Sequence, residues 1–153
     1  MASTNVNVTA DNTITVNSAI SYGGGRSNGT LTFTSTSTVL NANVGSSSNS
    51  LNVVFASAVK LGADVTINTR GGDLTLNSTL DSNSSTAKGL TVSGSSGTAT
   101  FGGNIGSTYR LSGIDVTAGT INIGGNISTD ASAGTYSTSS LGAAGWIRSD
   151  YNG

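Results

Sequence analysis

Short apolar–polar–apolar triplets recur along most of this chain, and they constrain its fold more than any other feature. Successive side chains of a strand point to opposite faces, so each triplet places two apolar side chains on one face and a polar one on the other. Gly, Ser, Asn and Asp separate the triplets, as expected between strands. The pattern predicts an all-β fold. The triplets are Ile14–Val16, Leu31–Phe33, Leu51–Val53, Val65–Ile67, Leu74–Leu76, Leu90–Val92, Ala99–Phe101, Ile114–Val116 and Ile121–Ile123.

The triplets return at a drifting interval. The segment 97–107 matches the segment 119–129 at an offset of 22 residues, and the triplet at Leu90 matches that at Ile114 at an offset of 24. Other steps are 17, 20, 23 and 25 residues, from Ile14 to Leu31, Leu31 to Leu51, Leu51 to Leu74 and Leu74 to Ala99. A repeat of this length is typical of one coil of a solenoid.

Two all-β architectures use such strands, an antiparallel sandwich and a right-handed parallel β-solenoid. Sandwich strands are longer and pack around buried aromatic side chains, whereas aromatic residues make up only 5% of this chain. The chain also has no Pro, so every strand N–H is available for pairing. We therefore predict a right-handed parallel β-solenoid with coils of about 17–25 residues. The predicted inward side chains are Ile14, Val16, Leu31, Phe33, Leu51, Val53, Val65, Ile67, Leu74, Leu76, Leu90, Val92, Phe101, Ile114, Val116, Ile121 and Ile123.

Two asparagines, Asn104 and Asn126, each follow a Gly-Gly pair in the repeat. On stacked coils they are predicted to form a ladder of amide hydrogen bonds. A Gly-Gly-Asn sequence is also a common turn, and the two interpretations are compatible.

The residue types that the chain lacks exclude several functions. It has no Cys and no His, so disulfides, thiolate nucleophiles, cysteine-bound metals and a Ser-His-Asp triad are all excluded. Its seven acidic residues are all Asp and are dispersed, and the nonapeptide calcium repeat is absent. We therefore expect no enzymatic activity, no cofactor and no metal site. Six scattered basic residues predict no nucleic-acid binding.

The sequence divides into three parts. Residues 1–130 carry the triplets and are predicted to be the β-solenoid domain. Residues 131–141 contain mainly Ser, Thr, Gly and Ala, which is typical of a linker. Residues 142–153 hold the only Trp and are predicted to be a C-terminal cap or the start of a following domain. No apolar run is long enough to span a membrane, and residues 1–5 lack the features of a signal peptide.

The segment 65–80, Val-Thr-Ile-Asn-Thr-Arg-Gly-Gly-Asp-Leu-Thr-Leu-Asn-Ser-Thr-Leu, and the paired Gly-Gly-Asn-Ile units resemble the repeat region of filamentous-haemagglutinin-like bacterial exoproteins and related large surface adhesins. The resemblance covers about residues 12 to 129. It implies a right-handed parallel β-helix, secretion across the outer membrane, and a role in adhesion outside the cell. The C-terminal piece is similar to segments that join shaft repeats to a head in phage tail fibres, which implies a virion as the alternative location.

Two groups of residues are candidates for surface binding. Alternating threonines resemble the rows with which some ice-binding solenoids contact ice, although we favour a Thr-rich solvent face as their explanation. Trp146 and Tyr151 are candidates for stacking on a carbohydrate. The threonines of the row are Thr30, Thr32, Thr34, Thr36 and Thr38.

These observations lead to one expected function and two alternatives. We expect a structural shaft or stalk module of a secreted or cell-surface bacterial adhesin, which presents a polar rod surface for adhesion. The first alternative is a shaft module of a phage tail fibre or another virion fibre, in which three chains associate. The second is an ice- or glycan-binding β-solenoid. Expected partners are a host-cell or surface receptor or glycan, and further copies of the chain through the solenoid ends or as a fibre trimer.

Overall fold

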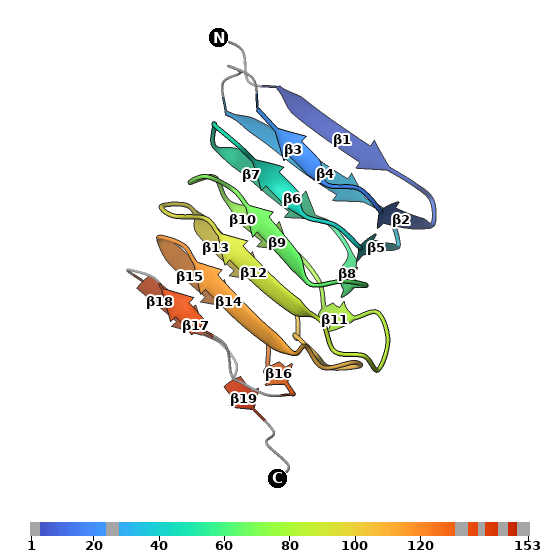
Figure 1. The fold of residues 1–153 in the computed structure, drawn as a ribbon. Coiled ribbons are helices and arrows are strands. Elements are labelled where there is room, and N and C mark those ends of the chain that lie inside the picture. The colour runs from blue at the N-terminus through green and yellow to red at the C-terminus, as the bar shows by residue number, and fades with distance from the viewer. Residues whose placement is uncertain (1–3, 24–27, 131–134, 138–139, 144–146, 150–153) are drawn as a thin grey trace.

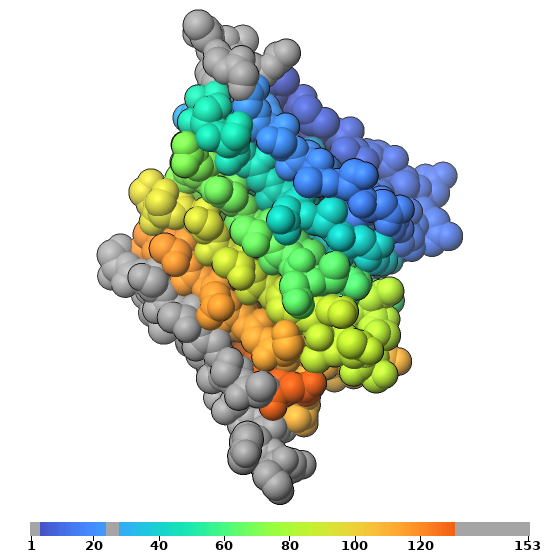
Figure 2. Space-filling view, in the orientation of Figure 1, coloured from blue at the N-terminus to red at the C-terminus, as the bar shows by residue number. Residues whose placement is uncertain are grey.

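The chain winds into a parallel β-solenoid, as the triplets predicted (Figure 1). A computed structural model describes residues 4–23, 28–130, 135–137, 140–143 and 147–149. Within them every named strand pairing is parallel, and no helix is present. Coils follow one another as slanted bands in the space-filling view (Figure 2).

Most coils contribute one strand to each of three faces, which we call faces A, B and C. Face A consists of β1 (Asn5–Thr9), β4 (Gly29–Thr34), β7 (Leu51–Phe55), β10 (Leu74–Leu76), β13 (Thr98–Phe101), β15 (Thr120–Ile123) and β18 (Ser140–Ala143). Face B consists of β2 (Thr13–Val16), β5 (Ser37–Leu40), β8 (Ala58–Leu61) and β11 (Leu80–Ser82), and continues as the pair β16 (Ile127–Thr129) and β19 (Ile147–Ser149). Face C consists of β3 (Ile20–Tyr22), β6 (Val44–Ser46), β9 (Val65–Asn68), β12 (Gly89–Ser93), β14 (Gly113–Thr117) and β17 (Thr135–Ser137). A single bridging residue, Ile105, joins Leu80 to Ile127 where face B has no strand.

The ladders give the repeat length directly. Paired strands join residues 20 to 25 positions apart, for example Ile121 with Leu141 and Leu74 with Ala99. The predicted offsets of 22 and 24 in the later coils are confirmed by the pairing of Ala99 with Ile121 and of Leu90 with Ile114.

Three of the intervals that we predicted between triplets in the earlier coils do not match the strand pairing in the structure. Ile14 pairs with Thr38 on face B, whereas Leu31 belongs to face A, so the 17-residue step between them is not a repeat. Both Leu31 and Leu74 pair with Val53 rather than with Leu51. Those two steps are therefore wrong by two residues, which leaves the apolar side chains on the same face because the side-chain period is two.

The core runs along the inside of the coils as columns of stacked apolar side chains. All the predicted inward residues are buried except Ile14, which is partly buried in the first coil and packs against the core. The rings of Phe33 and Phe55 stack with their centroids 4.8 Å apart and their planes 7° apart, a geometry worth about 0.5–1.5 kcal/mol beyond area burial. Core positions that the triplets missed are mainly on face B and its continuation: Leu40, Val59, Leu61, Leu80, Ile105 and Ile127.

Side chains of Asn and Asp continue the hydrogen bonding at the corners. The Asn43 Oδ1 accepts a hydrogen bond from the Thr66 N–H at 2.8 Å, and the Asp64 Oδ1 accepts one from the Gly89 N–H at 2.8 Å. The predicted stacking of Asn104 and Asn126 takes the same form, because the Asn126 N–H donates to the Asn104 Oδ1 at 3.0 Å. Each of these acceptors belongs to the coil before its donor. Each accepts a hydrogen bond from a main-chain N–H that the hydrogen bonds of the strand ladder do not reach.

Three short strands continue the parallel pairing beyond residue 130. They are β17, β18 and β19, which pair with β14, β15 and β16 respectively. They lie in the region where we placed a linker and a cap or following domain, and that division stays a prediction.

Replacing an inward side chain should cost far more than replacing its outward neighbour. Leu76 is 1% exposed and Thr75 points outward between two coils. We expect Leu76→Asp to reduce the free energy of unfolding by several kcal/mol, because it buries an unpaired charge. Thr75→Asp should cost under about 1 kcal/mol as a surface change. Urea denaturation measures both, and equal losses would contradict the assignment of the two faces.

The corner hydrogen bonds predict a second difference. We expect Asn104→Ala to cost about 1 kcal/mol, because it removes the acceptor of the Asn126 N–H. Asn104→Asp should retain most of this stability, because its carboxylate accepts the same bond, as Asp64 and Asp73 do elsewhere. Urea denaturation of the two variants would contradict this role if Asp were as destabilising as Ala.

Candidate functional site

The outer surface of face A carries columns of small polar side chains. Thr30, Thr32 and Thr34 lie on β4 and point away from the core, as predicted. Neighbouring strands place other residue types beside them, since Thr30 pairs with Asn52 and Thr32 pairs with Val54. The outward columns therefore contain other residue types besides Thr. Further along face A, both Thr98 and Thr100 of β13 point outward.

The rest of the predicted threonine row does not lie on this surface. A bend at residues 35 and 36 carries the chain from face A to face B, so the alternation restarts there. Thr36 is exposed at the bend, whereas Thr38 is 2% exposed and lies inside, between Ile14 and Val59. The predicted surface position of Thr38 is therefore wrong. The two aromatic candidates, Trp146 and Tyr151, lie outside the described residues.

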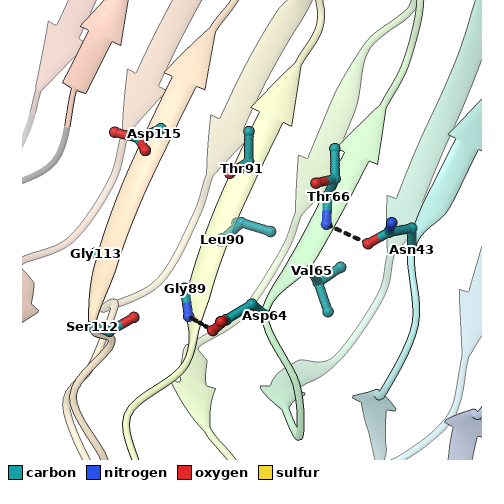
Figure 3. A pocket seen from close by; sticks show the side chains of 10 residues that line it. All are labelled: Asn43, Asp64, Val65, Thr66, Gly89, Leu90, Thr91, Ser112, Gly113 and Asp115. Carbon is teal, nitrogen blue, oxygen red and sulfur yellow. Dashed lines mark hydrogen bonds between the residues drawn. The ribbon is translucent and has the colours of Figure 1, made fainter.

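A polar hollow opens on face C, and sequence reasoning did not find it. Its volume is about 420 Å³. Figure 3 shows polar side chains from successive coils around a floor that has two glycines. The lining residues are Asn43, Asp64, Val65, Thr66, Gly89, Leu90, Thr91, Ser112, Gly113 and Asp115.

The register explains why the hollow forms at this place. Thr66, Thr91 and Asp115 are paired neighbours and form one outward column across three coils. Two residues toward the start of each strand lies a second outward column, in which Gly89 pairs with Gly113. These two glycines leave space where side chains would otherwise stand. A search for outward glycines at the offset of 24 would have found them, once the coil length was known.

Hydrogen bonds hold two of the side chains at the rim of the hollow. The Asp64 carboxylate accepts from the Gly89 N–H, and the Asn43 amide oxygen accepts from the Thr66 N–H (Figure 3). Asp64 and Asp115 supply negative charge, and the lining contains no Lys or Arg. The arrangement suits a ligand that donates hydrogen bonds and carries no negative charge.

Two smaller hollows lie near the first coils. One, of about 280 Å³, lies on face C around Gly45 and its neighbours Ser21 and Asn68, which share its outward column. The other, of about 150 Å³, lies at the start of face A beside Asn5, Thr30 and Asn52. Neither is lined by a charged side chain.

The acidic residues form no large cluster within the described part of the chain, where Asp64 and Asp115 are the two that share the hollow. There, no group of three or more His, Cys, Asp or Glu side chains is placed to hold a metal ion. Asp73 and Asp115 are 42 residues apart in the sequence, which is close to two coils, but they lie on different faces. Asp73 precedes β10 of face A and accepts from the Thr98 N–H at 2.8 Å, whereas Asp115 lies in β14 of face C. They do not form a carboxylate pair flanking one coil.

The described residues also contain no helix with the length and hydropathy needed to cross a bilayer. Comparisons with protein-family models, with curated proteins and with solved structures give no match to this chain.

We expect the purified protein to show no turnover on a panel of polysaccharides and no strong thermal hysteresis. The first expectation follows from the separation of Asp73 and Asp115, and the second from the interruption of the threonine columns by Asn52 and Val54. Reducing-sugar assays and nanolitre osmometry measure the two activities. Turnover abolished by Asp73→Asn, or hysteresis lost in Thr34→Tyr, would contradict these expectations.

Proposed function

We propose that this chain is a structural shaft module of a secreted or cell-surface bacterial adhesin, similar to the repeat regions of filamentous-haemagglutinin-like exoproteins. The observation that carries the proposal is the continuous parallel pairing of the described coils on face A, from β1 to β18. Because each coil is held mainly by its neighbours, such a fold grows by adding coils and makes a stiff rod of any length. A rod of this kind separates a binding end from a cell.

The outward residues support an extracellular, adhesive role. The outer columns on faces A and C contain mainly Thr, Ser, Asn and Gly, with few charges. Such a surface is rich in hydrogen-bond donors and acceptors and makes weak long-range electrostatic fields. A host receptor or a glycan is the partner that it suits best.

The first described coil supports association along the rod axis. Among the described strands, β1 pairs with β4 alone, so its other edge presents main-chain N–H and C=O groups. Val6 of β1 belongs to the inward column of Leu31 and is 44% exposed. An edge with these properties is completed by another coil stacked on it, from the same or another chain.

Immunogold electron microscopy tests this proposal. Antibodies raised against the folded protein should label filaments or fibres on the outer surface of the source cells. Labelling confined to the cytosol would contradict the proposal. Labelling confined to phage particles would support the virion-fibre alternative in its place.

Light scattering after size-exclusion chromatography separates the same two candidates. An adhesin shaft is expected as a single chain or as end-to-end multimers whose mass rises with concentration. A defined trimer would contradict the adhesin proposal and favour the virion fibre, in which three chains associate side by side.

A further inference from the structure

We propose that the hollow on face C binds an amino-sugar unit of a glycan. This inference goes beyond the shaft role and does not depend on it, because a shaft needs no ligand of its own. Three features of the hollow lead to this class of ligand: its shape, its hydrogen-bonding groups and its charge.

The shape is set by the two outward glycines. The hollow of about 420 Å³ falls within the range of about 300–1,000 Å³ that is common for small-molecule sites. Gly89 and Gly113 lie side by side on β12 and β14, so the floor is main chain that one face of a pyranose ring can approach closely. Side chains of Thr91, Ser112 and Asp115 stand around this floor (Figure 3).

The hydrogen-bonding groups of the lining suit a ligand with many hydroxyls. Thr66, Thr91 and Ser112 carry hydroxyls that both donate and accept, while the carboxylates of Asp64 and Asp115 only accept. The bond from the Gly89 N–H fixes the direction of the Asp64 carboxylate at 2.8 Å. A carboxylate has about four lone-pair sites, so Asp64 retains acceptor capacity for a sugar hydroxyl.

The charge of the lining selects among sugars. Two carboxylates and no cationic side chain border the hollow, so uronic acids, sulfated sugars and phosphates are repelled. The ammonium group of an amino sugar is attracted. At about 4 Å in water, one such pair of charges changes affinity about fivefold. We therefore expect an amino sugar to bind most tightly, a neutral hexose less tightly and a uronate most weakly.

The test is a titration of the whole ¹⁵N-labelled protein by NMR with glucosamine, glucose and glucuronate as probes. We expect glucosamine to shift the amide signals of Thr66, Gly89 and Gly113 and to bind about fivefold more tightly than glucose. Glucuronate should bind more weakly than both. Shifts confined to other faces, or glucuronate binding as tightly as glucosamine, would overturn the proposal.

Gly89→Ala tests the shape without removing a polar group. Its added Cβ would lie 3.2 Å from the Ser112 Oγ and 3.7 Å from the Asp64 Oδ1, so only the end of a side chain must adjust. We expect an unchanged melting temperature and a loss of glucosamine binding of at least about tenfold, because the methyl group fills the floor. Unchanged binding in a folded Gly89→Ala protein would overturn the proposal.

Asp64→Asn and Asp115→Asn test the charge. Asn at position 64 can still accept from the Gly89 N–H, as Asn43 accepts from the Thr66 N–H. Each variant should remove part of the roughly fivefold preference for glucosamine, the double variant should remove all of it, and glucose binding should stay nearly unchanged. These variants decide the question if Gly89→Ala does not fold.

Asp73→Asn is the matched control for the charge variants. It changes the net charge by the same amount and can keep the bond from the Thr98 N–H, but it lies outside the hollow. It should bind glucosamine as the wild type does. A loss equal to that of Asp115→Asn would show a nonspecific effect of net charge and overturn the proposal.

Discussion

Parallel pairing between coils is the interaction on which the rest of this structure depends. The strands are only three to six residues long, and strands so short are not stable alone or as isolated pairs. Pairing on both sides, on three faces, gives them stability and aligns the inward columns. A slip of one residue in the register of a strand would move the buried side chains of that strand to the solvent face. The corner acceptors, such as Asn43 and Asp64, continue this pairing where the strand ladder stops.

The sequence was sufficient to predict the fold class and most of the core on faces A and C, because triplets such as Leu74–Leu76 alternate without interruption. Face B beyond its first strand was missed for a physical reason. Its inward positions include hydroxyl side chains, Thr38 and Ser82, which are buried and hydrogen-bonded. Period-two reasoning also continued the threonine row through the bend at residues 35 and 36, where the chain changes face.

The candidate site could not be predicted from local sequence, because its residues meet only through the register. Asp64, Gly89 and Gly113 come from three coils, at offsets of 25 and 24 residues. These offsets vary because the corners differ in length: three residues separate β8 from β9, and six separate β11 from β12. Arg70 and Ser95 each have a positive φ, of 52° and 50°, at the corner that follows face C. A side chain in this region of the Ramachandran plot carries no strong sequence signal.

The glycines show how one scaffold can carry both a structural and a binding role. At Gly103 an added Cβ would lie 2.6–2.8 Å from the main chain of Ser78 and Thr79, so this glycine is required by the packing of adjacent coils. At Gly89 the nearest atom is the Ser112 hydroxyl, and the missing side chain leaves a hollow instead. The strand pairing fixes where each outward side chain lies, but it does not fix the residue type at that position. Outward residues can therefore change from coil to coil and create a ligand site without disturbing the pairing that makes the rod.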